Sequence, residues 1–259
     1  MKKIILTTAA AAGLISIPGA AAAQGTYVSV TGGYVLPSDS DNSGATTADI
    51  AATDDFGAIP AGTSVGWNTE FDNGFEASGA IGYATESGLR FEGQLFYNSY
   101  DVETHSGLTV GGGNIDAVDV AVLTRGPADD ANPTVGAVIA DGQGDVSNFG
   151  LFGNIYYDIG GPDATFKPFV GAGLGYQWTD VNYQPSGVDV ADDSDGSFGY
   201  QLMAGAGFEV SEGLDIFAQY TYRDSFNDPE VELNLLPATL EVETQQSIVS
   251  LGVRFNFGG

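Results

Sequence analysis

The sequence contains no cysteine, so the fold uses neither disulfide bonds nor thiolate metal sites. Basic residues are scarce as well: seven lysines and arginines stand against 34 aspartates and glutamates, giving a formal net charge of −27. A surface of this charge repels the phosphates of nucleic acids, which excludes nucleic acid as a partner. The chain also has a single histidine, His105, so it offers little from which to build acid–base catalysis.

Long hydrophobic runs are absent except at the N-terminus. Two lysines there precede an apolar run, residues 4–17, and small residues follow it. This order is typical of a secretory signal peptide, which we predict to span residues 1–23 and to be cleaved before Gln24. The alternative, a membrane anchor, needs roughly 20 apolar residues, more than this run contains. We therefore expect residues 24–259 to form the mature chain as one domain.

Glycine and aromatic residues, by contrast, are abundant, with 38 glycines, 15 phenylalanines and 12 tyrosines. Eight segments alternate apolar residues with polar or small ones, as β-strands do when their two faces meet different environments. Each segment has the roughly ten residues that a tilted strand needs to cross a bilayer. The predicted strands are 26–36, 74–84, 89–100, 147–159, 166–178, 198–210, 214–223 and 246–257.

The connections between these strands are alternately long and short. The long ones are 37–73, 101–146, 179–197 and 224–245, and the short ones are 85–88, 160–165 and 211–213. A soluble sandwich has no reason to place every long connection at one end. A bacterial outer-membrane barrel does, because backbone groups in hydrocarbon need partners that only a closed sheet supplies. The predicted fold is therefore all-β: an eight-stranded antiparallel up-and-down transmembrane β-barrel with long extracellular loops and short periplasmic turns.

Aromatic residues on the apolar faces gather near the strand ends. One belt lies toward the long connections and the other toward the short ones. Such girdles are expected where rings sit at the depth of lipid headgroups, whereas a soluble aromatic-rich core would scatter them. The predicted girdle residues are Tyr34, Phe75, Tyr83, Phe91, Tyr97, Phe149, Tyr157, Trp178, Tyr200, Phe208, Tyr222, Phe255 and Phe257.

Most basic residues outside the signal peptide fall on the polar face of the strands, which we expect to point inward. An unpaired charge in a narrow interior is costly, so acidic partners should lie nearby. All the predicted members except Arg223 are near short turns or the C-terminus, which favours a cluster in the periplasmic half. Because eight strands leave room only for side chains, we expect a plugged interior. The predicted charge network is Arg90, Glu92, Asp158, Lys167, Glu209, Asp215, Arg223 and Arg254, with Glu76 as a further inward carboxylate.

Four stretches carry a resemblance to a known family: LFGNIYYDIG, FKPFVGAGLGYQW, FGYQLMAGAGFEVSEGLDIFAQYTYR and the terminal SIVSLGVRFNF. They resemble strands of the small outer-membrane β-barrel proteins of Gram-negative bacteria, which include opacity proteins, OmpA-type transmembrane domains and porin-family surface antigens. The resemblance covers the whole mature chain. It implies a location in the cell outer membrane, Sec export, insertion by the barrel-assembly machinery, and no catalysis in most members. Phe255 and Phe257 would form the C-terminal assembly signal, although Gly258 and Gly259 follow them.

The long connections carry most of the acidic residues, in runs such as SDSDN at 38–42 and DVADDSDG at 189–196. Clustered carboxylates are candidate sites for Ca²⁺ or Mg²⁺, but acidic runs more often form a solvated surface, and no stretch has the full EF-hand spacing. Residues 116–126 and 133–141 also alternate, which predicts an extracellular hairpin within 116–141. The alternative is that this segment enters the membrane as part of a ten-stranded barrel.

Together these features predict a non-enzymatic outer-membrane protein with a structural or surface-interaction role, such as adhesion or envelope integrity. We expect a monomer in contact with lipid and lipopolysaccharide, without a cofactor. A small porin-like channel for passive solute diffusion is the second hypothesis. A surface lipid hydrolase is a third, prompted by His105 and Ser106. Adjacent strand residues point to opposite sides, however, and a base must reach its nucleophile, so a solvated loop histidine is the simpler interpretation.

Overall fold

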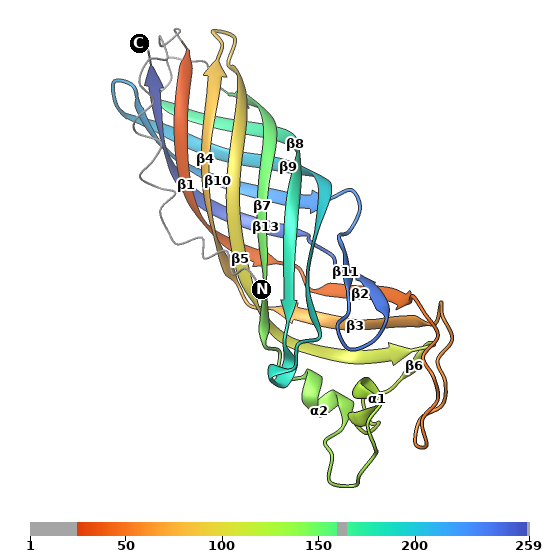
Figure 1. Ribbon diagram of the computed structural model, residues 1–259. Coiled ribbons are helices and arrows are strands. Elements are labelled where there is room, and N and C mark those ends of the chain that lie inside the picture. Colours follow the sequence, from red (N-terminus) through yellow and green to blue (C-terminus); the bar gives the residue numbers. More distant parts are fainter. Residues whose placement is uncertain (1–24, 160–164, 258–259) are drawn as a thin grey trace.

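Eight strands close into an antiparallel barrel in the computed structural model, which describes residues 25–159 and 165–257 (Figure 1). Each strand pairs with the next one in the ring, and Thr26 opposite Phe257 closes it. This ring confirms the eight-stranded up-and-down barrel that the sequence predicts and contradicts the ten-stranded alternative. The strands of the ring are β1 (Thr26–Pro37), β4 (Gly74–Ala84), β5 (Leu89–Val110), β7 (Gly144–Asp158), β8 (Phe166–Tyr183), β9 (Ala191–Ser211), β10 (Leu214–Ser225) and β13 (Gln246–Phe257).

Several strands continue well beyond the predicted bilayer-crossing segments. The long connections between ring strands lie at the end of the barrel away from the short turns, and we call them the extracellular lobe. The lobe comprises residues 37–73, 101–146, 179–197 and 224–245. We call the rest of the ring the membrane barrel. Short strands in the lobe extend the sheet from β5 in the order β3, β2, β12 and β11 (Figure 1). Connections predicted as loops are therefore largely folded. The added strands are β2 (Ser40–Thr46), β3 (Ser64–Phe71), β6 (Gly113–Asn114), β11 (Glu230–Glu232) and β12 (Ala238–Glu241).

The extracellular hairpin predicted within 116–141 does not form. Two short helices, α1 (Ala121–Thr124) and α2 (Val135–Ile139), occupy this segment, and a single bridge joins Asp119 to Thr134. The Thr134 hydroxyl caps α2 by accepting a hydrogen bond from the Ala137 N–H. Val135 and Ile139, one helical turn apart, bury their side chains in the lobe. The apolar residues that suggested a strand thus form the buried face of helix α2.

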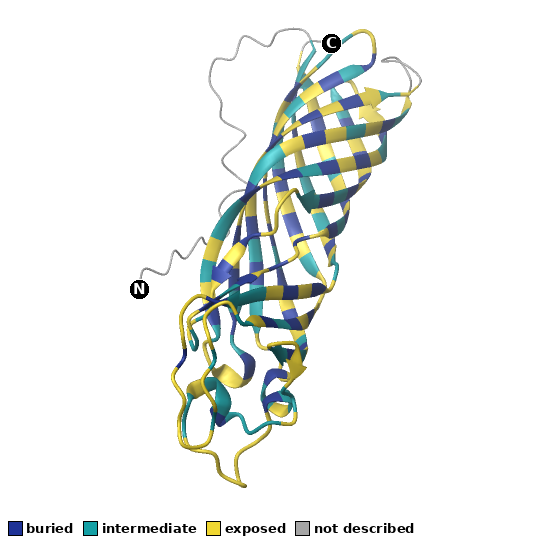
Figure 2. Ribbon diagram, turned by 90° about the vertical axis from the view of Figure 1, so that its right-hand side faces the viewer, coloured by how far each residue is buried: buried dark blue, intermediate teal, exposed yellow. Residues whose placement is uncertain are grey.

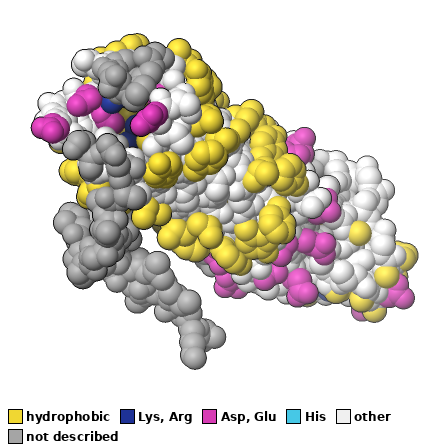
Figure 3. All heavy atoms as spheres, turned by 90° about the horizontal axis from the view of Figure 1, so that it is seen from above, with side chains coloured by type: hydrophobic (Ala, Val, Ile, Leu, Met, Phe, Trp, Pro, Cys, Tyr) yellow, Lys and Arg dark blue, Asp and Glu magenta, His cyan; other side chains and the backbone are white. Residues whose placement is uncertain are grey.

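Alternate residues of the ring strands are exposed and buried, which gives the barrel the chequered pattern of Figure 2. The exposed positions of the membrane barrel are hydrophobic: Leu251 is 70% exposed and Leu174 is 64% exposed. Figure 3 shows these side chains as a hydrophobic zone, with acidic side chains toward the lobe. In the part of the chain that the structure describes, no helix has the length and hydropathy needed to span a membrane.

The extracellular lobe has an apolar core of its own. Its members come from the lobe strands, from α2 and from the outer ends of the ring strands, and they include Trp67, Val102, Tyr183, Leu240 and Ile248. A short 3₁₀ helix, η1 (Pro185–Gly187), lies against α2 beside this core. The lobe is therefore packed around an apolar core to which the outer ends of the ring strands contribute.

Candidate functional site: the barrel interior

Charged side chains from six neighbouring strands meet in the half of the interior nearest the short turns. The Arg90 Nε on β5 donates to both carboxylate oxygens of Asp158 on β7, at 3.0 and 2.9 Å. On the opposite side, the Arg254 guanidinium lies 3.4 Å from Asp215. Lys167 bridges Glu209 at 3.2 Å and Asp215 at 3.6 Å. Each of these three predicted cations therefore has an acidic partner from the predicted set, and Figure 3 shows basic side chains among acidic ones at this end.

Aromatic rings surround these two arginines. The Arg90 guanidinium carbon lies 4.5 Å from the centroid of Tyr156 and 5.1 Å from that of Phe169. The Arg254 guanidinium carbon lies 5.3 Å from the centroids of both Tyr27 and Phe217. A cation over an aromatic face is stabilised by the ring quadrupole, most strongly where water is excluded. We call these arginines, their acidic partners and these four rings the lower layer.

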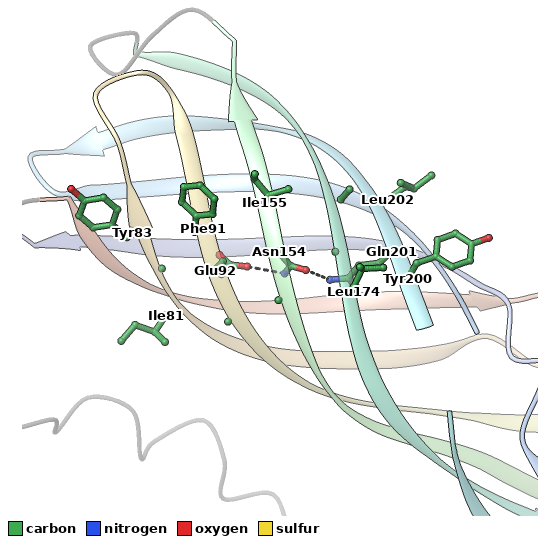
Figure 4. Close-up of a pocket in the computed structure, with 15 residues that line it drawn as sticks. Ile81, Tyr83, Phe91, Glu92, Asn154, Ile155, Leu174, Tyr200, Gln201 and Leu202 are labelled. Carbon is green, nitrogen blue, oxygen red and sulfur yellow. Dashed lines mark hydrogen bonds between the residues drawn. The ribbon is translucent and has the colours of Figure 1, made fainter. Parts of the chain in front are cut away.

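Glu92 joins the lower layer through hydroxyl and amide groups. Its carboxylate accepts hydrogen bonds from Tyr27 Oη at 3.0 Å and from Tyr156 Oη at 3.2 Å. Asn154 Nδ2 donates to it at 3.3 Å, and Gln201 Nε2 donates to Asn154 Oδ1 at 2.8 Å. Figure 4 shows this chain crossing the inner wall while Phe91, Ile155 and Leu202 extend away from it. Strand parity correctly predicted that Glu92 lies inside the barrel. It did not predict the uncharged side chains that donate hydrogen bonds to its carboxylate.

A second group of side chains fills the barrel nearer the lobe. Arg223 on β10 is fully buried and its Nη1 donates to Glu76 Oε2 on β4 at 2.6 Å. Its Nε and Nη2 both donate to Gln201 Oε1, at 3.2 and 3.0 Å. The ring of Phe96 lies 3.5 Å from the guanidinium carbon, and Phe152 lies 5.5 Å away. We call these five residues the upper layer.

The rings of both layers were missed at the sequence level, although strand parity could have located them. Phe96 shares its side of β5 with Arg90 and Gln94, and Phe152 shares its side of β7 with Asn154. Inward glycines on neighbouring strands provide the room: a Cβ at these positions would collide with the ring. Many of the glycines are explained in this way. The pairs are Tyr27 on Gly82, Phe96 on Gly150, Phe152 on Gly175, Tyr156 on Gly171, Phe169 on Gly205 and Phe217 on Gly252.

A small interior cavity lies beside the lower layer. Its volume is about 10 Å³, and it is lined by Ser29, Gln94, Gln219 and both lower-layer arginines among others. That volume holds about one water molecule. Buried amides cross-link the remaining positions: Asn98 Nδ2 donates to Gln246 Oε1 at 2.8 Å, and Asn98 Oδ1 accepts from Asn148 Nδ2 at 2.9 Å. The interior is thus a packed polar core.

The predicted girdle residues lie on the outer face of the barrel. Those toward the lobe include neighbouring pairs, Phe75 with Tyr97 and Phe149 with Trp178, whose ring centroids are 6.0 Å apart in both cases. Tyr200 and Tyr222 are only half-exposed, because both hydroxyls donate to Asp224. At the other end, Phe255 and Phe257, the predicted assembly signal, are exposed on β13. Gly258 and Gly259 and the predicted signal peptide lie outside the described residues.

His105 is not the solvated loop histidine that the sequence suggested. It is 3% exposed, its Nδ1 is 2.8 Å from Thr69 Oγ1, and burial lowers its pKa to about 4. Ser106 is exposed on the other side of the strand, as adjacent positions require. Thr69 and His105 place a hydroxyl and a base in contact, but no carboxylate orients the base: His105 Nε2 has no hydrogen-bond partner among the described residues.

The acidic stretches of the lobe do not converge on a common point. Among the described residues, no group of three or more acidic or histidine side chains is placed to hold a metal ion. Some carboxylates do approach one another: Asp145 lies opposite Asp101 in the β5–β7 pairing, and the pKa of Asp145 is raised by partial burial and by that neighbour. This surface is acidic and solvated.

Comparison with known proteins agrees with this architecture. A family model described as "Outer membrane protein beta-barrel domain" matches residues 7–255. The chain belongs to this outer-membrane β-barrel family. A relative named "Outer membrane protein", from Gluconacetobacter diazotrophicus, is 29% identical over 160 residues, which is 58% of this chain. The match spans 35% of that relative, so this barrel corresponds to about a third of its length.

Solved structures of other outer-membrane barrels share the fold. OprG from Pseudomonas aeruginosa superposes with a TM-score of 0.57 at 14% identity, covering 92% of this chain and 98% of that one. Neisserial surface protein A gives a TM-score of 0.43 at 17% identity, with 90% and 98% covered. At these identities the likeness to OprG concerns the fold alone. Any role for this outer-membrane β-barrel protein has to be argued from its own interior and lobe.

Proposed function

We propose that this protein is a closed, non-enzymatic outer-membrane barrel whose role is structural or one of surface interaction, such as adhesion or envelope integrity. One observation carries the proposal. Paired charges, amides and aromatic rings of the upper and lower layers occupy the lumen, and the interior cavity beside the lower layer has a volume of only about 10 Å³. An ion or solute would have to separate buried ion pairs in both layers to pass.

The energetics of those pairs support a permanently closed state. Arg223 and Glu76 are 0% and 5% exposed, so separating them would leave two charges without water or partner. Breaking a buried pair by removing one partner costs about 3–5 kcal/mol. The neighbouring rings of Phe96 and Phe152 add cation–π contacts to Arg223. An eight-stranded barrel has no spare diameter to go around this obstacle.

The folded lobe supports a surface role. Its interior is apolar and packed, while its outer face carries the acidic residues of the long connections. A rigid acidic surface standing beyond the membrane suits electrostatic contact with a basic partner, because complementary charge speeds association. Catalysis is disfavoured because His105 and Thr69 are buried, and no carboxylate of the described residues bonds His105 Nε2 as the orienting group of a hydrolase would.

The biogenesis that we infer follows from family membership. The chain would be exported through the Sec pathway, lose residues 1–23, and be inserted by the barrel-assembly machinery with Phe255 and Phe257 as its signal. It would then work as a monomer in the cell outer membrane of a Gram-negative bacterium, its girdles in contact with lipid and lipopolysaccharide. Divalent cations would act at most as diffuse counterions of the acidic lobe. Pulse labelling with a signal-peptidase inhibitor would test the cleavage.

Conductance of the refolded protein in planar bilayers separates the closed barrel from the second hypothesis, a small diffusion channel. We expect the unmodified protein to show no reproducible unitary steps. Arg223→Ala combined with Glu76→Ala would empty the upper layer, and Arg90→Ala with Asp158→Ala the lower one; only the variant with both layers emptied should conduct. Unitary conductance in the unmodified protein, unchanged in these variants, would contradict the proposal.

A further inference from the structure

A second enclosed space lies in the extracellular lobe, apart from the barrel interior. It is a cavity of about 60 Å³ between β3, the outer end of β5, β8 and the helices. Its walls are almost wholly hydrophobic and include Val65, Leu108, Ile139 and Leu233. Partly exposed leucines of the turn between β11 and β12, Leu235 and Leu236, line its outer side.

Three of the residues that line this cavity carry polar atoms without a partner. The indole Nε1 of Trp67, the Nε2 of His105 and the hydroxyl of Tyr183 are buried, and none of them has a hydrogen-bond partner among the described residues. Trp67 is 8% exposed, His105 is 3% exposed and Tyr183 is fully buried, so bulk water does not serve them. Buried polar atoms are nearly always satisfied, and three orphans beside one cavity suggest that something outside the chain pairs with them.

The hydrogen bonds around His105 are compatible with a ring hydrogen on Nε2. Asn42 Nδ2 donates to Thr69 Oγ1 at 2.7 Å, and Thr69 Oγ1 lies 2.8 Å from His105 Nδ1. We take the Thr69 hydroxyl to donate its single hydrogen to Nδ1, which places the ring hydrogen on Nε2. Since burial lowers the pKa of His105 to about 4, the ring is neutral at physiological pH. With this tautomer the cavity wall offers two uncharged N–H donors, Trp67 Nε1–H and His105 Nε2–H, beside the hydroxyl of Tyr183.

We propose that this cavity is a binding site for a small, neutral, apolar molecule that carries one hydrogen-bond acceptor, such as a short-chain ketone or aldehyde. The two donors would share the carbonyl oxygen and the aliphatic walls would cover the alkyl part. A lysine-free and arginine-free lining within a chain of net charge −27 disfavours anions. A cation would find no carboxylate in the lining. Because a cavity of roughly 150 Å³ is needed for benzene, only a molecule of a few heavy atoms fits without movement of the leucine cover.

The chain provides its own reporter for this site. It has two tryptophans, so Trp178→Phe leaves Trp67 as the only indole. In the full-length Trp178→Phe protein refolded in nanodiscs, we expect 2-butanone to shift the single indole ¹H–¹⁵N signal downfield in a saturable way. Butylammonium should not shift it. Nor should 2-methyl-1-butene, in which a methylene replaces the oxygen, cause a downfield change.

Two variants then test the site itself. Val65→Phe fills the cavity and should abolish the saturable shift, whereas the matched change Val210→Phe at an exposed position of the membrane barrel should leave it unchanged. His105→Leu keeps an apolar wall but removes one donor, and should weaken binding about tenfold, the usual worth of one hydrogen bond.

A shift that does not saturate, or one that is equal in Val65→Phe and in Val210→Phe, would overturn the proposal, because the ketone would then be acting through the lipid. Heat-modifiable migration shows whether each variant has folded. If Val65→Phe does not fold, His105→Leu decides: unchanged affinity for 2-butanone overturns the proposal. The outcome is independent of whether the barrel conducts.

Discussion

The membrane barrel and the extracellular lobe place their side chains in opposite ways. In the membrane barrel, arginines and carboxylates are buried and leucines and phenylalanines are exposed. In the lobe, apolar side chains are buried and acidic ones are exposed. Both regions are built from the same antiparallel strands with the same alternation of period two. The difference shows that the solvent outside each region, rather than the secondary structure, decides which class of side chain is buried.

Strand β5 passes through both regions and shows the change within one element. Its inward residues run from Arg90 through Phe96 to Val102, so the interior becomes apolar toward the lobe. Its outward residues run from Phe91 and Leu95 to Asp101. The two faces exchange character just beyond the outer girdle. We therefore place the boundary between lipid and water at this level of the barrel.

The largest effect should come from breaking the upper layer of the membrane barrel. Arg223→Ala leaves Glu76 buried without its partner, and we expect a loss of about 3–5 kcal/mol in the free energy of unfolding. The double variant Arg223→Met and Glu76→Gln removes both charges and should recover most of that loss. Denaturant unfolding in lipid vesicles measures both. Equal destabilisation by the single and double variants would mean that the charge itself is unimportant.

Charge on the outer surface should distinguish the two regions next. Leu251 faces lipid and is 70% exposed, so Leu251→Arg should cost about 2–4 kcal/mol if the side chain lies near the midplane. Glu103 is exposed on the lobe, where Glu103→Arg should change stability by less than about 0.5 kcal/mol. Unfolding in the same vesicles provides the comparison. Similar costs at both positions would break the distinction between the regions.

A pH effect should be confined to the lobe. The pKa of His105 is about 4 in the folded chain, below its ordinary value of 6.5. Between these two values the unfolded state binds a proton that the folded state does not, so stability falls as pH drops through this window. The loss is at most about 3 kcal/mol and is complete below pH 4. His105→Leu should remove this component, seen as a shallower difference between unfolding midpoints at pH 7.5 and pH 4.

The smallest expected effect concerns glycines that differ only in the face on which they lie. Gly82 faces inward under the Tyr27 ring, and Gly82→Ala should cost about 1–2 kcal/mol because the ring must move. Gly93 faces lipid with nothing within 4 Å of an added Cβ, so Gly93→Ala should be neutral or slightly stabilising. Unfolding midpoints of the pair give the test. A cost at Gly93 as large as that at Gly82 would reject the packing argument.

The membrane barrel was predictable because each strand crosses one solvent boundary with an unbroken period of two. That pattern located the eight strands, the girdles and the inward charges. It was incomplete inside: only charged residues were predicted for the inward face, and the rings of Phe96 and Phe152, which accompany Arg223 there, were not.

The lobe was less predictable for two physical reasons. Its short segment Ser64–Phe71 alternates like a membrane strand, but it buries its apolar side against other loop segments that are far away in sequence. A register shift in the pairing of β3 with β5 then reverses the parity after Val102, which turns His105 inward. Counting residues from the membrane barrel would have placed His105 on the outside. Helix α2 shows the same limit, since apolar residues at 135 and 139 fit a helix as well as a strand.

Spin labels along the outer face of β5 would test the reversal of faces most directly. The absence of cysteine allows single labels at positions 91, 93, 95, 97, 101 and 103, none of which points into the packed interior. In lipid vesicles, collision with oxygen should dominate up to Tyr97, and collision with a water-soluble nickel complex should dominate from Asp101 onward. Uniform access to the nickel complex along all six positions, or shielding of Phe91 and Leu95 from both quenchers, would contradict the account.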